Sequence, residues 1–341
     1  MALLSLDTHR AYESVLKQWQ SGSGGSTGRG ISPAYSDVLM RHPLRMRDIV
    51  KFDQKKVEQH YDMYLALIQG LGQSLARVKV PTLTGDSLAV GTRDEFISRL
   101  KAQARQLKPL THDLHDWLSQ KWQDKKCGFV FEKAQAVGLD YRWVVYPDIT
   151  ASDTTFDGIF SSTEGMIDPD QIKVKAGVIK ATYMSSVGVR QLPTLIKDQL
   201  ADRIREDAFE YGATTKRPRD IAYLDLPALR YFAQVGRFNC LILTHMDICY
   251  SDYPIKICTD YLVKGKKVGY RPDQKFLDTV TPKYIALPAW DVAQLSKAKN
   301  WAQLPIVAQK FLKFISKQIG LPIFIITTGP KRNQTVVLEK V

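Results

Sequence analysis

Long apolar runs and paired cysteines are both missing from this sequence. No stretch approaches the ~20 consecutive apolar residues that cross a bilayer, and the apolar start meets Asp7, His9 and Arg10 too soon for a signal peptide. The four cysteines, at 127, 240, 249 and 258, include no C-x-x-C pair. This spacing matches no zinc module and favours reduced, buried thiols. We therefore expect a soluble cytoplasmic protein with no membrane partner.

Acidic residues are scarce relative to basic ones. The chain has 35 Asp and Glu against 48 Lys and Arg, which gives a net charge of +13. Such an excess favours polyanionic partners, such as nucleotides, nucleic acids or acidic surfaces. The basic residues are scattered, however, and no aromatic-basic motif of RNA-binding domains accompanies them. A solvated basic surface is favoured, and we expect no nucleic-acid partner.

The pattern of apolar residues changes along the chain. Residues 1–20 contain an amphipathic helix, 21–50 open with a Gly/Ser-rich stretch, and 51–126 are largely helical in pattern. From 127 to 341, β-branched runs alternate with helical patterns, which indicates an α/β fold with a mostly parallel central sheet flanked by helices. No repeat or clear linker interrupts the chain, so we predict a single domain over 1–341. The predicted strands are 128–132, 176–182, 239–244, 255–262 and 322–327, and the clearest predicted helices between them are 195–209, 225–236 and 302–319.

Two glycine- or arginine-containing loops have the residue types that bind anions. The Gly-rich stretch at 22–30 would let backbone N–H groups approach a phosphate. No Gly-Lys-Ser/Thr closes it, so it is not a Walker A loop, and a flexible linker explains it equally well. The loop at 210–219 has two threonines and three cations, among them Arg217 and Arg219. Arginine binds carboxylates and phosphates through two hydrogen bonds, but an exposed basic turn is an equal alternative.

Two further loops follow predicted strands. Asp247 comes shortly after the run at 239–244, where a carboxylate could accept hydrogen bonds from a guanine base or cap a helix. The loop at 327–332 follows the last predicted strand and could serve the same ligand. His112 and His115 lie three residues apart with no third metal ligand nearby, so we predict no metal site in this chain.

Taken together, these loops resemble the adenylosuccinate synthetase family in order and in spacing. The resemblance rests on eight segments, at 25–35, 44–48, 131–135, 146–155, 211–217, 243–247, 287–290 and 328–330. It implies the family's P-loop-type fold without its N-terminal portion. The family reaction joins IMP and aspartate, with GTP and magnesium, to make adenylosuccinate in AMP synthesis.

The resemblance also implies site residues. Thr27, Gln135 and Thr150 match positions that hold IMP, and Arg217 matches a position near its ribose. Arg45 matches an arginine that reaches the IMP phosphate of a neighbouring subunit, so the resemblance implies a homodimer.

The other two substrates have their own matching positions. Thr215, Arg217 and Arg219 match the aspartate-binding loop. Asp247 matches the carboxylate that reads guanine, and the remaining guanine-pocket positions are Thr328, Gly329 and Pro330.

Several family features have no counterpart in these 341 residues. The family's phosphate loop, its aspartate base and its histidine acid precede the part that the sequence matches, and no catalytic residue or magnesium ligand can be assigned. Other positions carry residues that differ from the family's. Lys133, Ala136 and Lys216 replace glycines, and Arg142 to Val145 interrupt a further motif. His245 replaces a lysine, Ser186 replaces an arginine, and Leu195 replaces a glutamate. Because phosphoryl transfer depends on positioning and charge neutralisation, we expect this chain alone to be inactive.

Two alternatives therefore stay open beside an ordinary synthetase. The chain could be one half of a split enzyme. It could also be a pseudoenzyme that acts as a nucleotide-binding or dimeric scaffold or regulatory subunit, which the internal departures favour.

Overall fold

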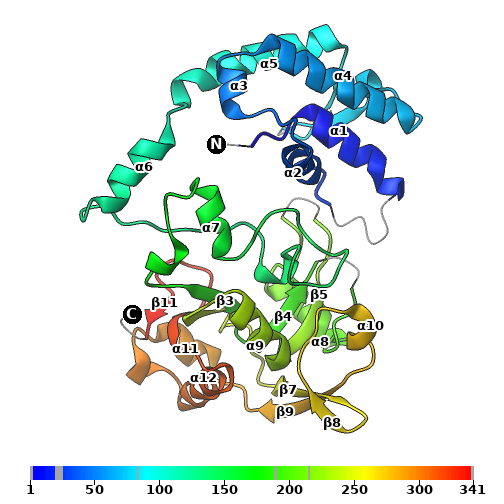
Figure 1. Cartoon of the computed structure of the whole chain (residues 1–341). Helices are drawn as coiled ribbons and strands as arrows, with labels where there is room; N and C mark the ends of the chain where they lie inside the picture. Colours follow the sequence, from blue (N-terminus) through cyan, green and yellow to red (C-terminus); the bar gives the residue numbers. More distant parts are fainter. Residues whose placement is uncertain (1–2, 20–25, 83, 188–189, 214–215, 339–341) are drawn as a thin grey trace. The chain divides into compact units, whose positions relative to one another are not determined.

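The computed structural model describes residues 3–19, 26–82, 84–187, 190–213 and 216–338. The chain divides into two compact units (Figure 1). The helical unit comprises Met1–Glu132, Thr150–Asp153 and Gly158–Ile167, and the sheet unit comprises Lys133–Ile149, Thr154–Asp157 and Asp168–Val341. The single domain expected over 1–341 stays a prediction.

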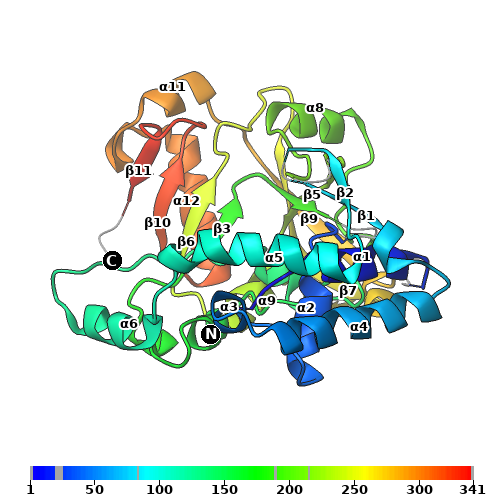
Figure 2. The same cartoon turned by 90° about the horizontal axis from the view of Figure 1, so that it is seen from above.

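The helical unit is built around α1, α4 and α5. In α4, the buried residues Val57, Tyr61, Tyr64 and Ile68 recur every three or four positions and so share one face of the helix. That face packs against α5, which runs beside α4 (Figure 2). The helices of this unit are α1 (Asp7–Leu16), α2 (Ile31–Leu39), α3 (Met46–Val50), α4 (Gln54–Gly70), α5 (Arg93–Leu107), α6 (Leu114–Gln123) and most of α7 (Asp157–Ser162), with a small hairpin of β1 (Lys79–Pro81) and β2 (Ser87–Ala89).

Local sequence signals account for where these helices begin. The α5 helix starts with a capping box: Thr92 N–H donates to Glu95 Oε2 at 2.7 Å, and Glu95 N–H donates to Thr92 Oγ1 at 3.4 Å. At α4, the Asp53 carboxylate accepts a hydrogen bond from Lys56 N–H at 3.2 Å. Among the described residues, no helix combines the length and hydropathy needed to span a membrane.

The sheet unit contains two mixed sheets. One has the strand order β11-β10-β6-β3, in which β3 (Ala176–Lys180), β6 (Cys240–Thr244) and β10 (Ile323–Thr327) are parallel and β11 (Thr335–Val337) is antiparallel. In the other, β5 (Asp220–Asp225) and β7 (Ile255–Val263) are parallel, whereas β4 (Tyr183–Ser186), β8 (Lys266–Val268) and β9 (Thr281–Leu287) pair antiparallel. The helices of this unit are α8 (Gln199–Asp207), α9 (Leu226–Val235), α10 (Gln274–Leu277), α11 (Val292–Lys297) and α12 (Ile306–Ile319).

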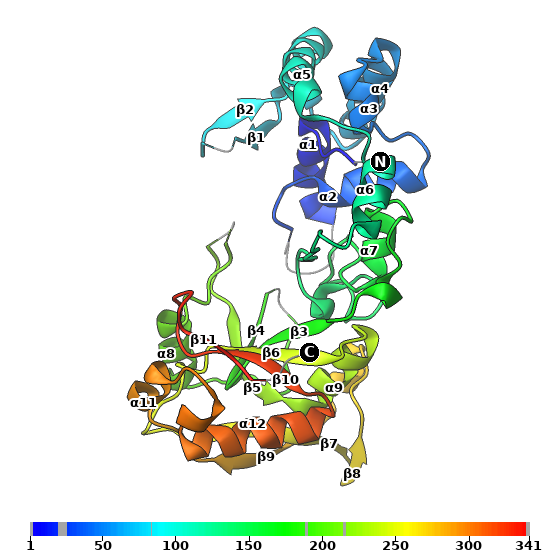
Figure 3. The ribbon, with the colours of Figure 1, turned by 90° about the vertical axis from the view of Figure 1, so that its left-hand side faces the viewer.

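The core of the sheet unit lies between its strands and α12. Phe311, Leu312 and Ile315 of α12 are buried with Leu241 and Ile326 of the neighbouring strands. Figure 3 shows α12 running along one face of the sheet that contains β6 and β10. These strand residues are buried apolar side chains, as expected for parallel strands that are covered by helices.

The structure confirms the α/β class and most of the predicted elements. The predicted strands at 176–182, 239–244, 255–262 and 322–327 appear as β3, β6, β7 and β10, and the three predicted helices appear as α8, α9 and α12. The predicted helix at 302–319 begins only at Ile306, because Pro305 cannot continue a helix that starts before it.

The predicted strand at 128–132 is wrong. Residues 128–133 have no regular secondary structure, and Phe129 and Phe131 instead lie near Trp122, with ring centroids 5.1 and 6.3 Å from the indole. A short apolar run can therefore serve aromatic packing as well as a strand, which its pattern alone does not reveal.

Candidate functional site

The carboxyl ends of three parallel strands bring two polar loops together. Lys180 at the end of β3 lies in register with Thr244 at the end of β6, and Ile326 of β10 lies in register with Leu243. In the following loops, Met246 N–H donates to the Thr327 carbonyl at 3.2 Å. The loops that begin after β6 and β10 are therefore held side by side at one edge of the sheet.

Asp247 lies in the first of these loops. The residue is half-buried and is followed by turn and irregular backbone, so it caps no helix. In the described part of the chain, no group donates a hydrogen bond to its carboxylate. The helix-cap alternative is thereby removed, and the carboxylate keeps its acceptor oxygens for another partner.

The second loop contains the residues expected to surround guanine. Thr328 is 1% exposed, and its N–H donates to the Gln334 carbonyl at 2.8 Å. Gly329 is buried beneath the Gln334 side chain, whose atoms lie 2.5 Å from the place that a Cβ would occupy. Pro330 is exposed. The chain reversal between β10 and β11 therefore holds Thr328 and Gly329 rigidly and presents Pro330 at the surface.

The arginine loop of the sheet unit is closed at its base. Arg219 N–H donates to the Glu210 carbonyl at 2.9 Å, and Gly212 N–H donates to the Arg217 carbonyl at 2.8 Å. Arg217 is exposed and Arg219 is half-buried. Thr215, the third residue expected here, lies outside the described residues.

Lys216 adopts a backbone conformation that favours glycine. Its φ is +55°, in the left-handed region, which costs a residue with a side chain about 1–2 kcal/mol. The resemblance places a glycine at this position. The loop keeps the left-handed turn although lysine stands in place of glycine, so the backbone path is preserved at an energetic cost.

One buried carboxylate joins the arginine loop to the sheet. Glu210 is 1% exposed; its Oε1 contacts Lys180 Nζ at 2.5 Å and accepts from Tyr183 Oη at 2.6 Å, while its Oε2 accepts from Arg219 Nη1 at 2.8 Å. Tyr183 Oη is also 3.2 Å from Nδ1 of His245. The chain of contacts runs from the arginine loop, through Glu210 and Tyr183, to the loop that carries Asp247.

The electrostatics of this group, here called the Glu210 cluster (Lys180, Tyr183, Glu210, Arg219 and His245), follow from burial and charge. Burial alone would raise the pKa of Glu210, but hydrogen bonds from Lys180 and Tyr183 outweigh it and lower that pKa to about 2. Burial lowers the pKa of Lys180, and the neighbouring Glu210 opposes this change. Burial and then the Lys180 charge lower the pKa of His245. At neutral pH the cluster therefore holds an ionised Glu210 among cations, with a neutral His245 beside it.

Sequence reasoning missed Glu210, Lys180 and Tyr183 as parts of the site. Glu210 begins the loop that was singled out, and Lys180 ends a correctly predicted strand. A buried glutamate at the start of a loop rich in arginine is the signal that could have identified the cluster, because a buried carboxylate needs a charged partner.

The helical unit contains three of the expected IMP residues. Thr27 is exposed, and Arg45 and Thr150 are half-buried. Gln135 and Arg217 belong to the sheet unit. Gln135 is exposed and has a φ of +64°, so its backbone is also in the left-handed region.

A glutamate that sequence reasoning missed anchors the described end of the Gly-rich loop. Glu13 is 5% exposed, accepts from Gly30 N–H at 2.5 Å and also accepts from the Ser26 hydroxyl. Gly30 has a φ of +72°, and a Cβ there would lie 2.6 Å from Ser5 Oγ and 2.8 Å from His9 Cβ. Only glycine fits this position, which fixes the backbone just after Thr27.

The described residues bring one potential metal-ligand set together: His9, Asp37 and His60, whose candidate atoms lie within 4.8 Å of one another. His9 Nδ1 accepts from Leu6 N–H at 2.9 Å, so a neutral His9 carries its hydrogen on Nε2 and donates it to Asp37 at 2.9 Å. The lone pair that a metal would need on Nε2 is therefore absent. Magnesium also prefers oxygen ligands, so the set does not fit the magnesium that the resemblance implies.

Burial and hydrogen bonding explain the charges in this histidine cluster. Burial, and then the neighbouring His9, lower the pKa of His60 to about 3. Burial would raise the pKa of Asp37, but hydrogen bonds from His9 and Tyr64 lower it below its usual value. The cluster is a buried polar network of the helical core in which Asp37 is ionised.

The fold and the edge of the sheet define a class of protein. This is an α/β protein whose polar loops gather beyond the carboxyl ends of parallel strands, where ligands bind in open α/β sheets.

Comparison with known proteins identifies the family. Residues 1–336 match the family model described as adenylosuccinate synthetase. The adenylosuccinate synthetase of Magnetococcus marinus is 30% identical over 98% of this chain and 74% of the relative, and that of Lactobacillus acidophilus is 34% identical over 92% and 70%. A fully ligated adenylosuccinate synthetase from Plasmodium falciparum shares the fold, with a TM-score of 0.84 and 24% identity over 99% of this chain and 77% of that one. The chain belongs to the adenylosuccinate synthetase family.

The Glu210 cluster predicts a pH-dependent stability. The pKa of Glu210 falls from 4.5 to about 2 on folding, so its contribution is fully present above pH 4.5 and is lost as the pH falls from 4.5 towards 2. The shift corresponds to roughly 3 kcal/mol. We expect Glu210→Gln to lower the free energy of unfolding by about that amount at pH 7, measured by urea denaturation, and the deficit to shrink below pH 4.5.

The matched control is Glu132→Gln, which removes an exposed carboxylate outside the cluster and should change the free energy of unfolding by less than about 0.5 kcal/mol. A Glu210→Gln variant as stable as the control at pH 7 would show that the cluster does not hold the loop.

Proposed function

We propose that these 341 residues bind a purine nucleotide monophosphate, IMP or a close relative, in the manner of adenylosuccinate synthetases, and that they do not complete the ligase reaction by themselves. In this proposal the IMP contacts come from Thr27, Arg45, Gln135, Thr150 and Arg217.

The observation that carries the proposal is the arginine loop at the carboxyl edge of the sheet, which Glu210 holds at its base through Arg219 and in which Arg217 is exposed. The Asp247 carboxylate is half-buried, accepts no hydrogen bond from the described residues, and connects through His245 and Tyr183 to the arginine loop. A half-buried acceptor gains most from a ligand that offers N–H donors, as a purine base does. The same edge therefore offers a base-reading carboxylate and, in Arg217 and Arg219, the cations suited to an anionic ligand.

A monophosphate is favoured over GTP because these residues include arginines that can bind one phosphate but no loop motif that binds a triphosphate. Arg217 and Arg45 can make charge-assisted contacts to one phosphate or to ribose hydroxyls. The triphosphate would need several backbone N–H donors and a lysine in a Walker-type loop, and no such motif occurs in this sequence. Without those donors, a triphosphate loses much of the compensation for its desolvation. The guanine-reading positions Asp247 and Thr328 to Pro330 would then support only weak GTP binding.

The chemistry of the family reaction requires more than binding. A general base has to lie within hydrogen-bonding reach of the proton that it removes, and no residue of this chain matches the family's base or acid. In the family reaction magnesium neutralises charge on the transferred phosphoryl group. Among the described residues, the His9, Asp37 and His60 set does not suit that ion. These points support the proposal that the chain alone does not catalyse the reaction.

The second candidate function is that of a pseudoenzyme, which would bind a nucleotide as a scaffold or regulatory subunit. Lys216 favours it, because this residue keeps a left-handed backbone where the family has glycine and adds a cation to the arginine loop. Half of a split synthetase would differ from a pseudoenzyme in one respect. It would gain activity when a second polypeptide supplies the phosphate loop.

Calorimetric titration is expected to rank IMP and GMP above GTP. Arg217→Ala should weaken IMP binding by about tenfold or more, because a hydrogen bond to a charged group contributes about 1.5–3 kcal/mol. The control is Arg203→Ala, since Arg203 is an exposed residue of the same unit that pairs with Asp252 at 2.9 Å. If GTP binds and IMP does not, the assignment of the IMP residues is wrong and the guanine pocket is what this chain has kept.

The proposal includes a homodimer. Arg45 lies in a segment whose backbone is fixed by Asp48, which accepts from Arg45 N–H at 2.9 Å. The preceding helix, α2, exposes an apolar stripe in which Ile31, Tyr35 and Leu39 recur every four residues. Exposed apolar patches of this kind mark protein interfaces.

Light scattering at tens of micromolar, an order-of-magnitude range for modest interfaces, is expected to give a dimer. Leu39→Glu, which places a charge in the stripe where Leu39 is 83% exposed, should shift the mass towards a monomer. Leu110→Glu, at an 80% exposed position outside the stripe, is the control and should leave the mass unchanged. A wild-type monomer throughout this range would contradict the dimer.

A further inference from the structure

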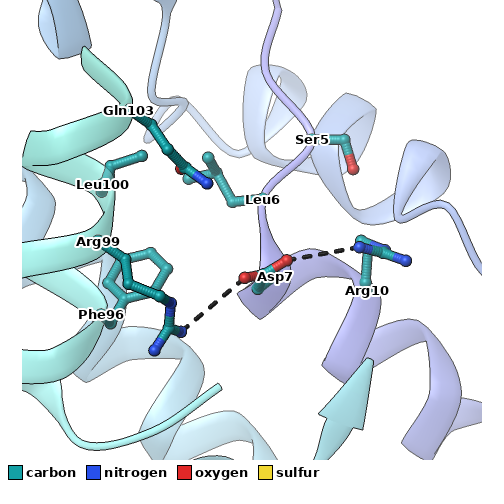
Figure 4. A pocket seen from close by; sticks show the side chains of 8 residues that line it. All are labelled: Ser5, Leu6, Asp7, Arg10, Phe96, Arg99, Leu100 and Gln103. Atoms are coloured by element: carbon teal, nitrogen blue, oxygen red, sulfur yellow. Dashed lines mark hydrogen bonds and ion pairs between the residues drawn. The ribbon is translucent and has the colours of Figure 1, made fainter. Parts of the chain in front are cut away.

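A cavity of about 150 Å³ lies within the helical unit, between the start of α1 and one face of α5 (Figure 4). Its apolar side is formed by Leu6, Phe96 and Leu100, which are buried. Its polar side contains Ser5, Asp7, Arg10, Arg99 and Gln103. None of the residues assigned to IMP, aspartate or GTP lines it.

The charges in the cavity are only loosely paired. Asp7 lies between two guanidinium groups, with Oδ1 at 3.5 Å from Arg10 Nη1 and Oδ2 at 3.9 Å from Arg99 Nη2 (Figure 4). Charge-assisted hydrogen bonds between such groups are normally about 2.7–2.9 Å long. The Nε atom of Arg10 is buried and has no hydrogen-bond partner in the described part of the chain. Arg10 Nη2 donates to the Pro81 carbonyl and Arg99 Nη2 to the Val90 carbonyl, which holds both guanidinium groups at the cavity wall. The remaining N–H groups of the arginines and the Asp7 carboxylate can form shorter contacts with a suitable ligand.

The N-terminal end of α1 adds positive electrostatic potential to the cavity. The helix begins at Asp7 after Leu6, whose side chain cannot accept a hydrogen bond, and His9 Nδ1 accepts only from Leu6 N–H, so no N-cap side chain accepts from the N–H groups of the first turn. The free N–H groups of a helix start attract negative charge. The carboxylate of a ligand is thus favoured beside the arginines, while the Asp7 carboxylate favours a cationic group next to it.

We propose that this cavity binds a free α-amino acid with an apolar side chain. The ligand carboxylate would lie against Arg99 and Arg10, its ammonium group against Asp7, and its side chain against Leu6, Phe96 and Leu100. A cavity of 150 Å³ accommodates a group as large as benzene, whereas pockets for larger ligands have about 300–1,000 Å³. The volume suits an amino acid and is too small for a nucleotide.

The charge pattern distinguishes this ligand from simpler ions. A phosphate or a plain carboxylate would meet repulsion from Asp7, and a simple amine would meet repulsion from both arginines. Only a ligand with an ammonium and a carboxylate group on the same carbon satisfies all three side chains, and the apolar wall selects for an aliphatic or aromatic side chain.

The test is a calorimetric titration of the full chain with L-leucine and with two analogues that each lack one charge. These are 4-methylpentanoate, without the ammonium group, and 3-methylbutylamine, without the carboxylate. We expect a Kd on the order of 1 mM for L-leucine. Each analogue should bind about tenfold more weakly or worse, because each loses hydrogen bonds to charged groups.

Two variants of the cavity and two controls locate the binding. Arg99→Gln should weaken L-leucine at least about tenfold, and Asp7→Asn should reduce the preference for L-leucine over 4-methylpentanoate. Arg93→Gln, on α5 but paired with Asp62 at 3.1 Å outside the cavity, and Arg203→Ala, in the sheet unit, should leave the affinity unchanged. Circular dichroism checks that each variant is folded. The comparison of L-leucine with its analogues uses the wild-type chain, so it tests the proposal even if a variant does not fold.

Three results would overturn the proposal. The first is no measurable heat with L-leucine at about ten times the expected Kd. The second is equal or tighter binding of 4-methylpentanoate or inorganic phosphate, which would show a simple anion site. The third is an affinity for L-leucine that Arg99→Gln leaves unchanged.

Discussion

The buried carboxylate of Glu210 is the interaction on which the carboxyl edge of the sheet depends. Transfer of an unpaired carboxylate from water into a protein interior costs several kcal/mol, so Glu210 can be buried only with partners. Lys180, Tyr183 and Arg219 supply them at 2.5, 2.6 and 2.8 Å. Because these partners come from the end of β3, from β4 and from the base of the arginine loop, their mutual position is fixed by one side chain. The loop that carries Asp247 joins the same network through His245.

At the positions that match the family site, the backbone conformation is retained although several side chains differ from those of the family. Lys216 keeps a left-handed conformation where the resemblance places glycine, and His245, also with a positive φ of +57°, stands in place of a lysine. The backbone path is therefore retained at positions where side chains have changed. A fold held in this way can keep a ligand-binding edge while the groups that perform chemistry are altered, which is why membership of the adenylosuccinate synthetase family and activity of this chain are separate questions.

The sequence predicts the parts of the fold that repeat a simple physical pattern. β6 and β10 are recognisable as short β-branched runs, and α12 as a helix with apolar residues every three or four positions. The strands β4, β5 and β9 are not evident from the sequence: buried and exposed positions do not alternate in β4 and β5, and β9 has no fully buried residue. The short apolar run at 128–132 has the length of a buried strand, but its aromatic side chains pack near Trp122 instead.

The candidate site could be predicted only as far as its loops. Asp247 and the loop at 210–219 were found because they follow strands or concentrate cations. Glu210 and Glu13 were missed, since each gains its role from partners distant in sequence or from burial that a single sequence does not show. The positions expected to bind IMP lie in both units, and their assignment rests on resemblance together with the local geometry reported for each.

The central claim, that these residues bind substrate without completing the reaction, is tested most directly by a turnover measurement. The purified chain is incubated with IMP, aspartate, GTP and magnesium, and adenylosuccinate is measured against a blank without protein. The account predicts no product above the blank in a preparation that binds IMP in the calorimeter. Measurable turnover that Arg217→Ala abolishes would contradict it.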